Sequence, residues 1–254
     1  MTIPVVALHG WGLNRRVFDA FAPRLEREVI TLDLPGHGLA IEPAAMQQAG
    51  WDIEAIATLL LDRMPPRAIV LGWSLGGTLA LQLAAQAPAR VAALVLIATT
   101  PRFAVATDWP HGADPLVLKR FAEQLTKDWR RTVQEFLALQ VRGDRDAITT
   151  LAALHAALTA HGECSKETLQ RAVALLHAAD LRALLPRITQ PALVIAGQYD
   201  RVVHPAASRD LAARLLSGEF LEIPRCGHAP FLSHEEIVAS ACNAFCAQLD
   251  REAA

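Results

Sequence analysis

The sequence carries no strong excess of charge and no long apolar run, and each absence argues against a class of protein. Its 254 residues hold 24 basic and 26 acidic side chains, a net charge of −2. The positive charge typical of nucleic-acid-binding proteins is therefore missing. Proline, arginine or aspartate interrupts every apolar run before the roughly 20 residues needed to cross a membrane. We expect neither nucleic acid nor a membrane among its partners.

Cysteines are few, and their positions do not indicate disulfides. Residues 1–10 lack the basic region and apolar core of a signal peptide, which predicts a cytoplasmic protein. Cys242 and Cys246 lie one helical turn apart and are expected to be packing residues. The sequence also lacks His-Glu-x-x-His, paired Cys-x-x-Cys and Walker motifs. We therefore expect no metal and no cofactor.

The chain is long enough for one large α/β domain. Hydrophobic residues make up 52% and charged residues 20%, as in a compact globular enzyme. Short apolar runs alternate with helical stretches, which predicts a mainly parallel sheet covered by helices on both faces. The predicted strands are 3–8, 28–33, 67–72, 91–97, 192–197 and 218–223. The predicted helices are 15–26, 50–64, 76–88, 205–216 and 234–250.

Between residues 101 and 186 the pattern changes. Strand signals disappear and amphipathic helical stretches take over, at 114–127, 128–141, 144–160 and 165–178. We expect a core built from 1–100 and 187–254, with 101–186 inserted as a helical lid over the carboxyl edge of the sheet.

Residues 68–81 combine a short apolar strand, a Gly-x-Ser-x-Gly turn and a helix. This arrangement is typical of the nucleophile elbow of serine hydrolases with the α/β-hydrolase fold. Glycine is needed at 72 and 76 because strand and helix approach closely there. Ser74 is then exposed at the end of a parallel strand. A chance match is the alternative, since the short motif also occurs in ordinary loops, but the flanking strand and helix favour the elbow.

A serine nucleophile needs a base to take its proton and an acid to orient that base. In this fold the chain order is Ser, then Asp or Glu, then His. Asp200 follows a buried strand and is the candidate acid, although an aspartate there could also cap the next helix. Asp33 also follows a strand, but it precedes Ser74 and lies in a Leu-Pro-Gly-His-Gly turn.

His228 lies in the loop between the last strand and the last helix, where this fold holds its base. Of the other eight histidines, His155, His161 and His177 lie in the predicted lid helices, and His111 and His204 lie in loops. The segment His9-Gly10-Trp11-Gly12 follows the first strand, where α/β-hydrolases place part of the oxyanion hole. We assign the two oxyanion donors to the backbone N–H groups of Trp11 and Leu75.

Four segments together resemble one family of α/β-hydrolases, the pimeloyl-[acyl-carrier protein] methyl ester esterases of biotin synthesis. They are 8–14, 71–77, 131–133 with 136–140, and 227–231 with 233–234, and the resemblance extends over nearly the whole chain. It implies hydrolysis of a methyl ester on a pimeloyl chain held by acyl-carrier protein, through an acyl-enzyme and with release of methanol. By the same resemblance Ser74, Asp200 and His228 are the catalytic residues.

The resemblance also implies an acyl pocket with apolar and aromatic walls. The substrate-binding residues would be Trp11, Ser74, Leu75, Phe136, Leu137, Ala138, Leu139, Gln140 and His228. Ordinary packing of lid against core is the alternative for Phe136, Leu137 and Leu139.

Acyl-carrier protein is acidic, so its docking surface should be basic. The expected patch on the insertion is Lys127, Arg130, Arg131, Arg142 and Arg145. Glu135 departs from the family pattern, in which a basic residue is expected at this position. A charged stretch can also be simply a solvated face.

Two other functions remain open at this point. One is a broad esterase acting on small-molecule esters of short chains. The other is a hydrolase fold that only binds ligands, which the complete set of Ser74, Asp200 and His228 disfavours. We expect a monomer in either case.

Overall fold

The computed structural model describes residues 2–43, 46 and 51–252. Its centre is a six-stranded sheet in which every neighbouring pair of strands is parallel. In spatial order the strands are β2 (Val29–Leu32), β1 (Val5–Leu8), β3 (Ala68–Trp73), β4 (Val91–Ile97), β5 (Ala192–Gly197) and β6 (Gly218–Ile223). All residues of β1, β3 and β5 are buried, as expected for strands covered on both faces.

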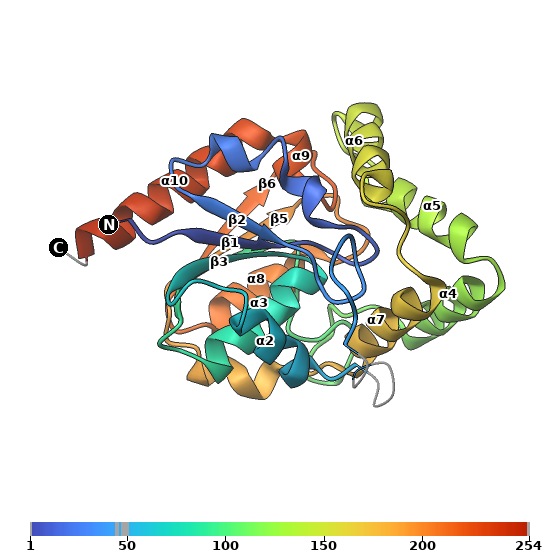
Figure 1. The fold of residues 1–254 in the computed structure, drawn as a ribbon, viewed down its shortest axis with the longest axis horizontal. Coiled ribbons are helices and arrows are strands. Elements are labelled where there is room, and N and C mark those ends of the chain that lie inside the picture. The colour runs from blue at the N-terminus through green and yellow to red at the C-terminus, as the bar shows by residue number, and fades with distance from the viewer. Residues whose placement is uncertain (1, 44–45, 47–50, 253–254) are drawn as a thin grey trace.

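Helices cover both faces of the sheet, as the sequence predicts (Figure 1). One face carries α2 (Ile53–Leu61), α3 (Leu75–Gln86) and α8 (Pro205–Arg214). The other face carries α9 (Pro230–Ser233) and α10 (Glu235–Glu252). None of the described helices is apolar enough over a sufficient length to span a membrane.

The predicted helix 15–26 is wrong. The segment forms two short 3₁₀ helices, η1 (Arg15–Phe18) and η2 (Ala22–Arg24). Pro23 has no N–H to donate, so a continuous α-helix would lose a hydrogen bond there. Phe18 and Phe21 instead pack their rings against Phe231, at centroid distances of 5.2 and 5.8 Å. Aromatic packing between distant segments therefore sets the path of this stretch.

The other predicted elements agree closely with the structure. The six strands are confirmed to within two residues at each end. The helix predicted for 50–64 is shorter in the structure, and residue 50 lies outside the described residues. The α9 turn was not predicted, because four residues beginning with a proline give no periodic signal.

The segment between β4 and β5 forms the predicted helices α4 (Pro115–Lys127), α5 (Trp129–Gln140), α6 (Ala147–Thr159) and α7 (Lys166–Ala178). A short 3₁₀ helix, η3 (Arg182–Arg187), leads back to β5. The four helices group together beyond one end of the sheet (Figure 1). Because β1 runs from the amino terminus toward them, this end holds the carboxyl ends of the parallel strands. We call 101–186 the helical insertion.

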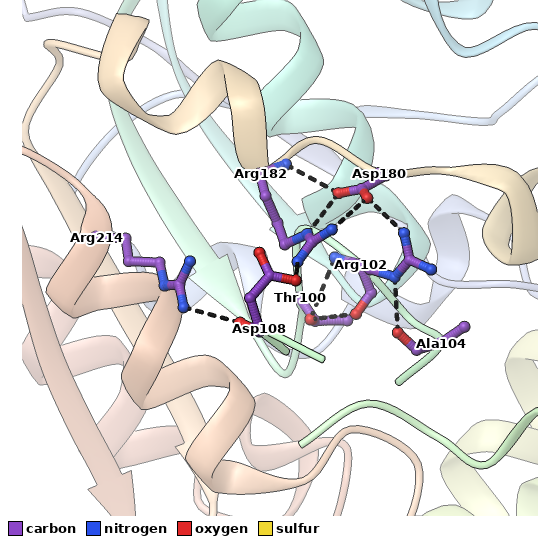
Figure 2. Close-up of polar contacts among 7 residues, drawn as sticks. All are labelled: Thr100, Arg102, Ala104, Asp108, Asp180, Arg182 and Arg214. Atoms are coloured by element: carbon purple, nitrogen blue, oxygen red, sulfur yellow. Dashed lines mark hydrogen bonds and ion pairs between the residues drawn. The ribbon is translucent and has the colours of Figure 1, made fainter. Parts of the chain in front are cut away.

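Ion pairs tie the two ends of the helical insertion together (Figure 2). Arg102 near its start and Arg182 near its end both pair with Asp180. Arg182 also pairs with Asp108, whose backbone carbonyl accepts a hydrogen bond from Arg214 of α8 at 3.1 Å. The hydrogen bonds from Arg182, with a further one from Arg102, hold the pKa of Asp180 well below its usual range. We call this group the junction cluster.

Neutralising Asp180 should destabilise the fold in a pH-dependent way. Its pKa is lower in the folded protein than the unfolded value of about 3.9. The stabilisation is therefore complete above pH 4 and is lost as the pH falls toward the folded pKa. We expect Asp180→Asn to cost on the order of 1 kcal/mol at pH 7, or about 2–4 °C in melting temperature. The difference from wild type should narrow at pH 3.

Thermal unfolding at both pH values checks this prediction. Glu123→Gln is the matched control, because Glu123 forms only a long, exposed pair with Lys119 at 4.0 Å. An equal loss of stability in both variants, or a difference that does not depend on pH, would contradict the role given to Asp180.

Candidate active site

Ser74 occupies the tight turn between β3 and α3 and has a strained backbone. Its φ of +55° lies in the left-handed region that side chains other than glycine rarely adopt. The turn is held by hydrogen bonds on both sides of the residue. Ser74 N donates to the carbonyl of Ile97 at 2.9 Å, and the Ser74 carbonyl accepts from Gly77 N, Thr78 N and Thr99 Oγ1 at 2.9, 3.1 and 2.8 Å. These contacts keep Ser74 in a conformation that points its side chain out of the turn.

The glycines of the turn are required by close approach. A Cβ on Gly72 would lie 2.4 Å from the Gly76 carbonyl oxygen, and one on Gly76 would lie 2.1 Å from the Leu8 carbonyl oxygen. Both obstacles are backbone atoms, which cannot rotate away. The expectation that glycine is needed at both positions is therefore confirmed.

Asp200 and His228 come together although 28 residues separate them. Asp200 Oδ2 lies 2.7 Å from His228 Nδ1, and both side chains are fully buried. The other carboxylate oxygen accepts hydrogen bonds from the backbone N–H groups of Val202 and Val203 at 2.7 and 3.0 Å. His204, rather than Asp200, caps the following helix α8. The cap alternative for Asp200 is thus not what the structure shows.

The rival acid Asp33 has a different environment. Its carboxylate accepts hydrogen bonds from the backbone N–H groups of Arg15 at 2.7 Å and Leu39 at 3.0 Å. These contacts fasten the 33–39 turn, and the structure records no contact between Asp33 and His228. Asp33 therefore stabilises a turn, which is the role that its place next to the Leu-Pro-Gly-His-Gly segment indicates.

The second ring nitrogen of His228 has no partner. Nε2 is buried and makes no hydrogen bond to any described residue, while Nδ1 contacts Asp200. Burying a nitrogen without a hydrogen-bond partner costs free energy, and a catalytic role is one reason why a protein keeps such a group. Trp73, adjacent to Ser74, donates from Nε1 to the His228 carbonyl at 2.8 Å. His228 and the Ser74 turn are therefore fastened to each other, with one basic nitrogen left available.

The loop after β1 lies against Ser74. A Cβ on Gly10 would be 3.3 Å from the Ser74 Cβ. His9 anchors this loop: its Nε2 accepts from Leu34 N at 3.0 Å, so Nδ1 carries the proton and donates to the Gly10 carbonyl at 2.8 Å. Burial lowers the pKa of His9 to about 3, which keeps the ring neutral. Leu75, as first residue of α3, has a backbone N–H without a partner inside its helix.

An apolar cavity of about 110 Å³ opens beside Ser74, with walls from the core and the helical insertion. Trp11 forms part of one wall, and its ring centroid lies 5.4 Å from that of Phe121 and 5.1 Å from that of Phe136. The residues lining the cavity are Trp11, Ser74, Phe103, Ala113, Val117, Leu118, Phe121, Phe136, Leu139, Val173, Leu176, His177, Arg201 and Val202.

Only part of the predicted substrate-binding set lies on this cavity. Trp11, Ser74, Phe136 and Leu139 line it. Leu75, Leu137, Ala138, Gln140 and His228 are not among its lining residues. Leu137 is buried in the core, as the packing alternative holds, and Ala138 is exposed on the outer side of α5. The helical period accounts for Leu137 and Ala138, because residues 136 and 139 share one face of α5 whereas 137 and 138 do not.

Sequence reasoning missed the walls that come from α4 and α7. Val117 and Phe121 are four residues apart, and Val173 and Leu176 are three apart, so each pair lies on one helix face. This spacing could have identified them. Arg201 and Val202 give no such signal, since they lie in the loop after β5.

The predicted docking residues are exposed, but three of the five are paired with acidic side chains. Arg130 pairs with Glu163 at 3.0 Å, Arg131 with Glu135 at 2.8 Å and Arg145 with Asp146 at 3.0 Å. Glu135, the residue that departs from the family pattern, thus partly neutralises Arg131. Within the described residues no ion pair involves Lys127 or Arg142.

One group of the described residues has the composition of a metal site. Ligand atoms of Asp144, Cys226 and His234 lie within 4.8 Å of one another. Hydrogen bonds already engage all three: Asp144 accepts from Gly227 N, and Ser233 Oγ lies between Cys226 Sγ and His234 Nδ1. Burial raises the pKa of the Cys226 thiol to about 12, so it keeps its proton. The group is accounted for as a polar network at the loop that carries His228.

The family of the chain follows from comparison with known proteins. A family model for the alpha/beta hydrolase fold matches residues 3–235. An esterase from Exiguobacterium antarcticum superposes with a TM-score of 0.84 at 22% identity, over 96% of this chain and 91% of that one. The chain therefore belongs to the α/β-hydrolase fold family.

Sequence relatives define the family more narrowly. A pimeloyl-[acyl-carrier protein] methyl ester esterase of Stenotrophomonas maltophilia (strain R551-3) is 40% identical over 247 residues, covering 96% of this chain and 93% of that protein. The protein of the same name from Nitrosomonas europaea is 39% identical over 243 residues, covering 94% of each. The chain belongs to this family and is an esterase.

Proposed function

We propose that this protein hydrolyses the methyl ester of pimeloyl-[acyl-carrier protein] in biotin biosynthesis and releases methanol. The observation that carries the proposal is the buried 2.7 Å contact between Asp200 and His228, which leaves His228 Nε2 free near the strained Ser74 turn. The family and the apolar cavity beside Ser74 support the choice of substrate.

The mechanism assigns each group of the site one task. Ser74 Oγ attacks the ester carbonyl while His228 Nε2 takes its proton. Asp200 holds the imidazole in the required tautomer and stabilises the imidazolium. The oxyanion is bound by the backbone N–H groups of Trp11 and Leu75. Each such donor contributes roughly 3–4 kcal/mol to the barrier reduction in comparable sites.

Collapse of the tetrahedral intermediate breaks the bond to the methoxy oxygen, and His228 returns the proton so that methanol leaves. The acyl-enzyme on Ser74 then reacts with water, whose proton His228 takes in turn. His228 returns this proton to Ser74 Oγ as the acyl bond breaks, which regenerates the enzyme and leaves a free carboxylate on the carried chain.

The cavity suits a chain of methylene groups. Its walls are almost entirely aromatic and aliphatic, with Phe121 and Phe136 from the helical insertion packed against Trp11 from the core. Burial of each methylene contributes about 0.8 kcal/mol. We propose that the insertion acts as a lid, which shields the ester from bulk water and forms one wall of the acyl site.

We propose that the carrier docks on the exposed cations of the insertion. Lys127 and Arg142 have no ion-pair partner within the described residues, and Arg130, Arg131 and Arg145 would exchange their present partners for carrier carboxylates. The cytoplasmic location and the monomeric state also stay predictions.

Growth without biotin is the direct test of the substrate. We expect the gene for this chain to restore growth to a bacterium that lacks its own pimeloyl-carrier methyl ester esterase, and Ser74→Ala to fail. Kinetics on the carrier-bound methyl ester and on a p-nitrophenyl ester should favour the carrier-bound substrate. Comparable rates on both, without dependence on salt, would instead indicate a broad short-chain esterase.

Removing the charge of Asp200 should nearly abolish turnover without unfolding the protein. We expect Asp200→Asn to lower kcat by about 10⁴, by analogy with serine proteases, because the amide favours the wrong tautomer of His228. Steady-state kinetics on a p-nitrophenyl ester provide the measurement. Asp210→Asn is the control, since Asp210 is a half-exposed carboxylate of α8 next to His111. A nearly normal rate in Asp200→Asn would mean that another residue is the acid.

Charge reversal on the docking patch should affect only the carrier-bound substrate. For Arg130→Glu with Arg131→Glu we expect kcat/KM on that substrate to fall roughly tenfold or more at low salt, because the carrier is no longer attracted. The rate on a p-nitrophenyl ester should stay unchanged. Lys119→Glu with Arg120→Glu makes the same charge change elsewhere on the insertion and is the control. Equal losses on both substrates would show a folding defect instead.

A further inference from the structure

The loop that carries His228 is fastened to the helical insertion as well as to the core. Two consecutive N–H groups of this loop donate to the insertion: Gly227 N to Asp144 Oδ2 at 3.0 Å, and His228 N to the Gln140 carbonyl at 2.8 Å. Arg145 N donates back to the Arg225 carbonyl at 3.0 Å. The acceptors and this donor all belong to the end of α5 and the turn that follows it.

The core holds the same loop through its carbonyl groups. Tyr199 N donates to the Cys226 carbonyl and Trp73 Nε1 donates to the His228 carbonyl, both at 2.8 Å. The N–H groups of Gly227 and His228 therefore donate to the insertion, whereas the carbonyl groups of Cys226 and His228 accept from the core. A shift of the insertion against the core would act directly on the backbone of His228.

Packing leaves the loop little room between these two partners. A Cβ on Gly227 would lie 2.3 Å from the Gln140 carbonyl oxygen, and one on Gly197 would lie 1.9 Å from the Gly227 carbonyl oxygen. Glycine is flexible by nature, so the position of Gly227 depends on what its N–H and C=O contact.

Asp144 is the only side chain among these contacts to the insertion. It is buried, and its second oxygen accepts a hydrogen bond from Asp146 N at 3.0 Å, which fixes the carboxylate. Its own N–H donates to the Val141 carbonyl at 3.0 Å, so the turn itself is well defined. A rigid acceptor therefore meets the N–H of the residue directly before His228.

We propose that Asp144 is a positioning residue, which sets the place of the His228 ring relative to Ser74 by holding Gly227. The proposal rests on the proposed function, in which His228 is the base and Ser74 the nucleophile. Proton transfer requires the two atoms within hydrogen-bond reach. A misplacement of about 1 Å can cost roughly a hundredfold in rate. Removing the acceptor frees Gly227 and leaves its buried N–H unpaired.

The test compares three variants on p-nitrophenyl acetate, a small ester that needs no carrier. Asp144→Ala removes the acceptor, and we expect kcat to fall roughly 10- to 100-fold with KM little changed. Labelling of Ser74 by a fluorophosphonate should slow to a similar extent. Asp144→Asn keeps the shape and one amide oxygen, which can accept from Gly227 N while the contact to Asp146 N is lost, and it should retain most of the wild-type kcat.

Asp146→Ala is the matched control. It removes a carboxylate from the same turn, where the side chain pairs with Arg145, and we expect wild-type kcat. Melting temperatures of all variants separate loss of alignment from loss of fold. A folded Asp144→Ala enzyme with wild-type kcat would overturn the proposal, as would an equal loss in Asp146→Ala.

Gly227→Ala is a second test of the proposal if Asp144→Ala does not fold. Its Cβ would press the loop away from the Gln140 carbonyl while Asp144 stays in place, so kcat should again fall with KM little changed. Wild-type kcat in that variant would equally overturn the proposal. A wild-type enzyme that is inactive on esters and unreactive toward the fluorophosphonate would instead refute the proposed function.

Discussion

The contact between Asp200 and His228 is the interaction on which the rest of the site depends. A buried carboxylate is costly unless all its lone pairs are engaged. Here two backbone N–H groups of the following turn hold one oxygen and the imidazole holds the other. The arrangement requires the end of β5 and the loop after β6 to meet at one edge of the sheet. Parallel strands with right-handed crossovers bring these ends together.

The opposite half of the site depends on how closely backbone segments can approach. Gly72 and Gly76 let β3, the start of α3 and the end of β1 approach to distances that any side chain would prevent. The hydrogen bonds to the Ser74 carbonyl group hold this residue in its strained backbone conformation. One half of the site is thus fixed by glycines that have no side chain, and the other by the hydrogen bonds of the buried Asp200 carboxylate.

The sheet, the insertion and the three catalytic candidates could be predicted from the sequence because their signals are local. Buried parallel strands are short apolar runs, and the elbow is a contiguous motif. The segment 15–26 failed because its path is set by ring packing against Phe231, far away in the chain. Leu137 and Ala138 do not line the cavity, because a contiguous block on a helix cannot all face one side. The contact of Asp144 with Gly227 joins positions 83 residues apart and gives no sequence signal at all.

The junction cluster bears on how such a protein can change over evolution. Because Arg102 and Asp180 lie side by side, β4 and β5 can pair directly whatever the length of the segment between them. Closing a long loop costs little more than closing a short one. A different helical segment could therefore replace the insertion between β4 and β5 without disturbing the sheet. Such a segment would still have to provide hydrogen-bond acceptors for the loop that carries His228, and this requirement restricts which replacements give an active enzyme.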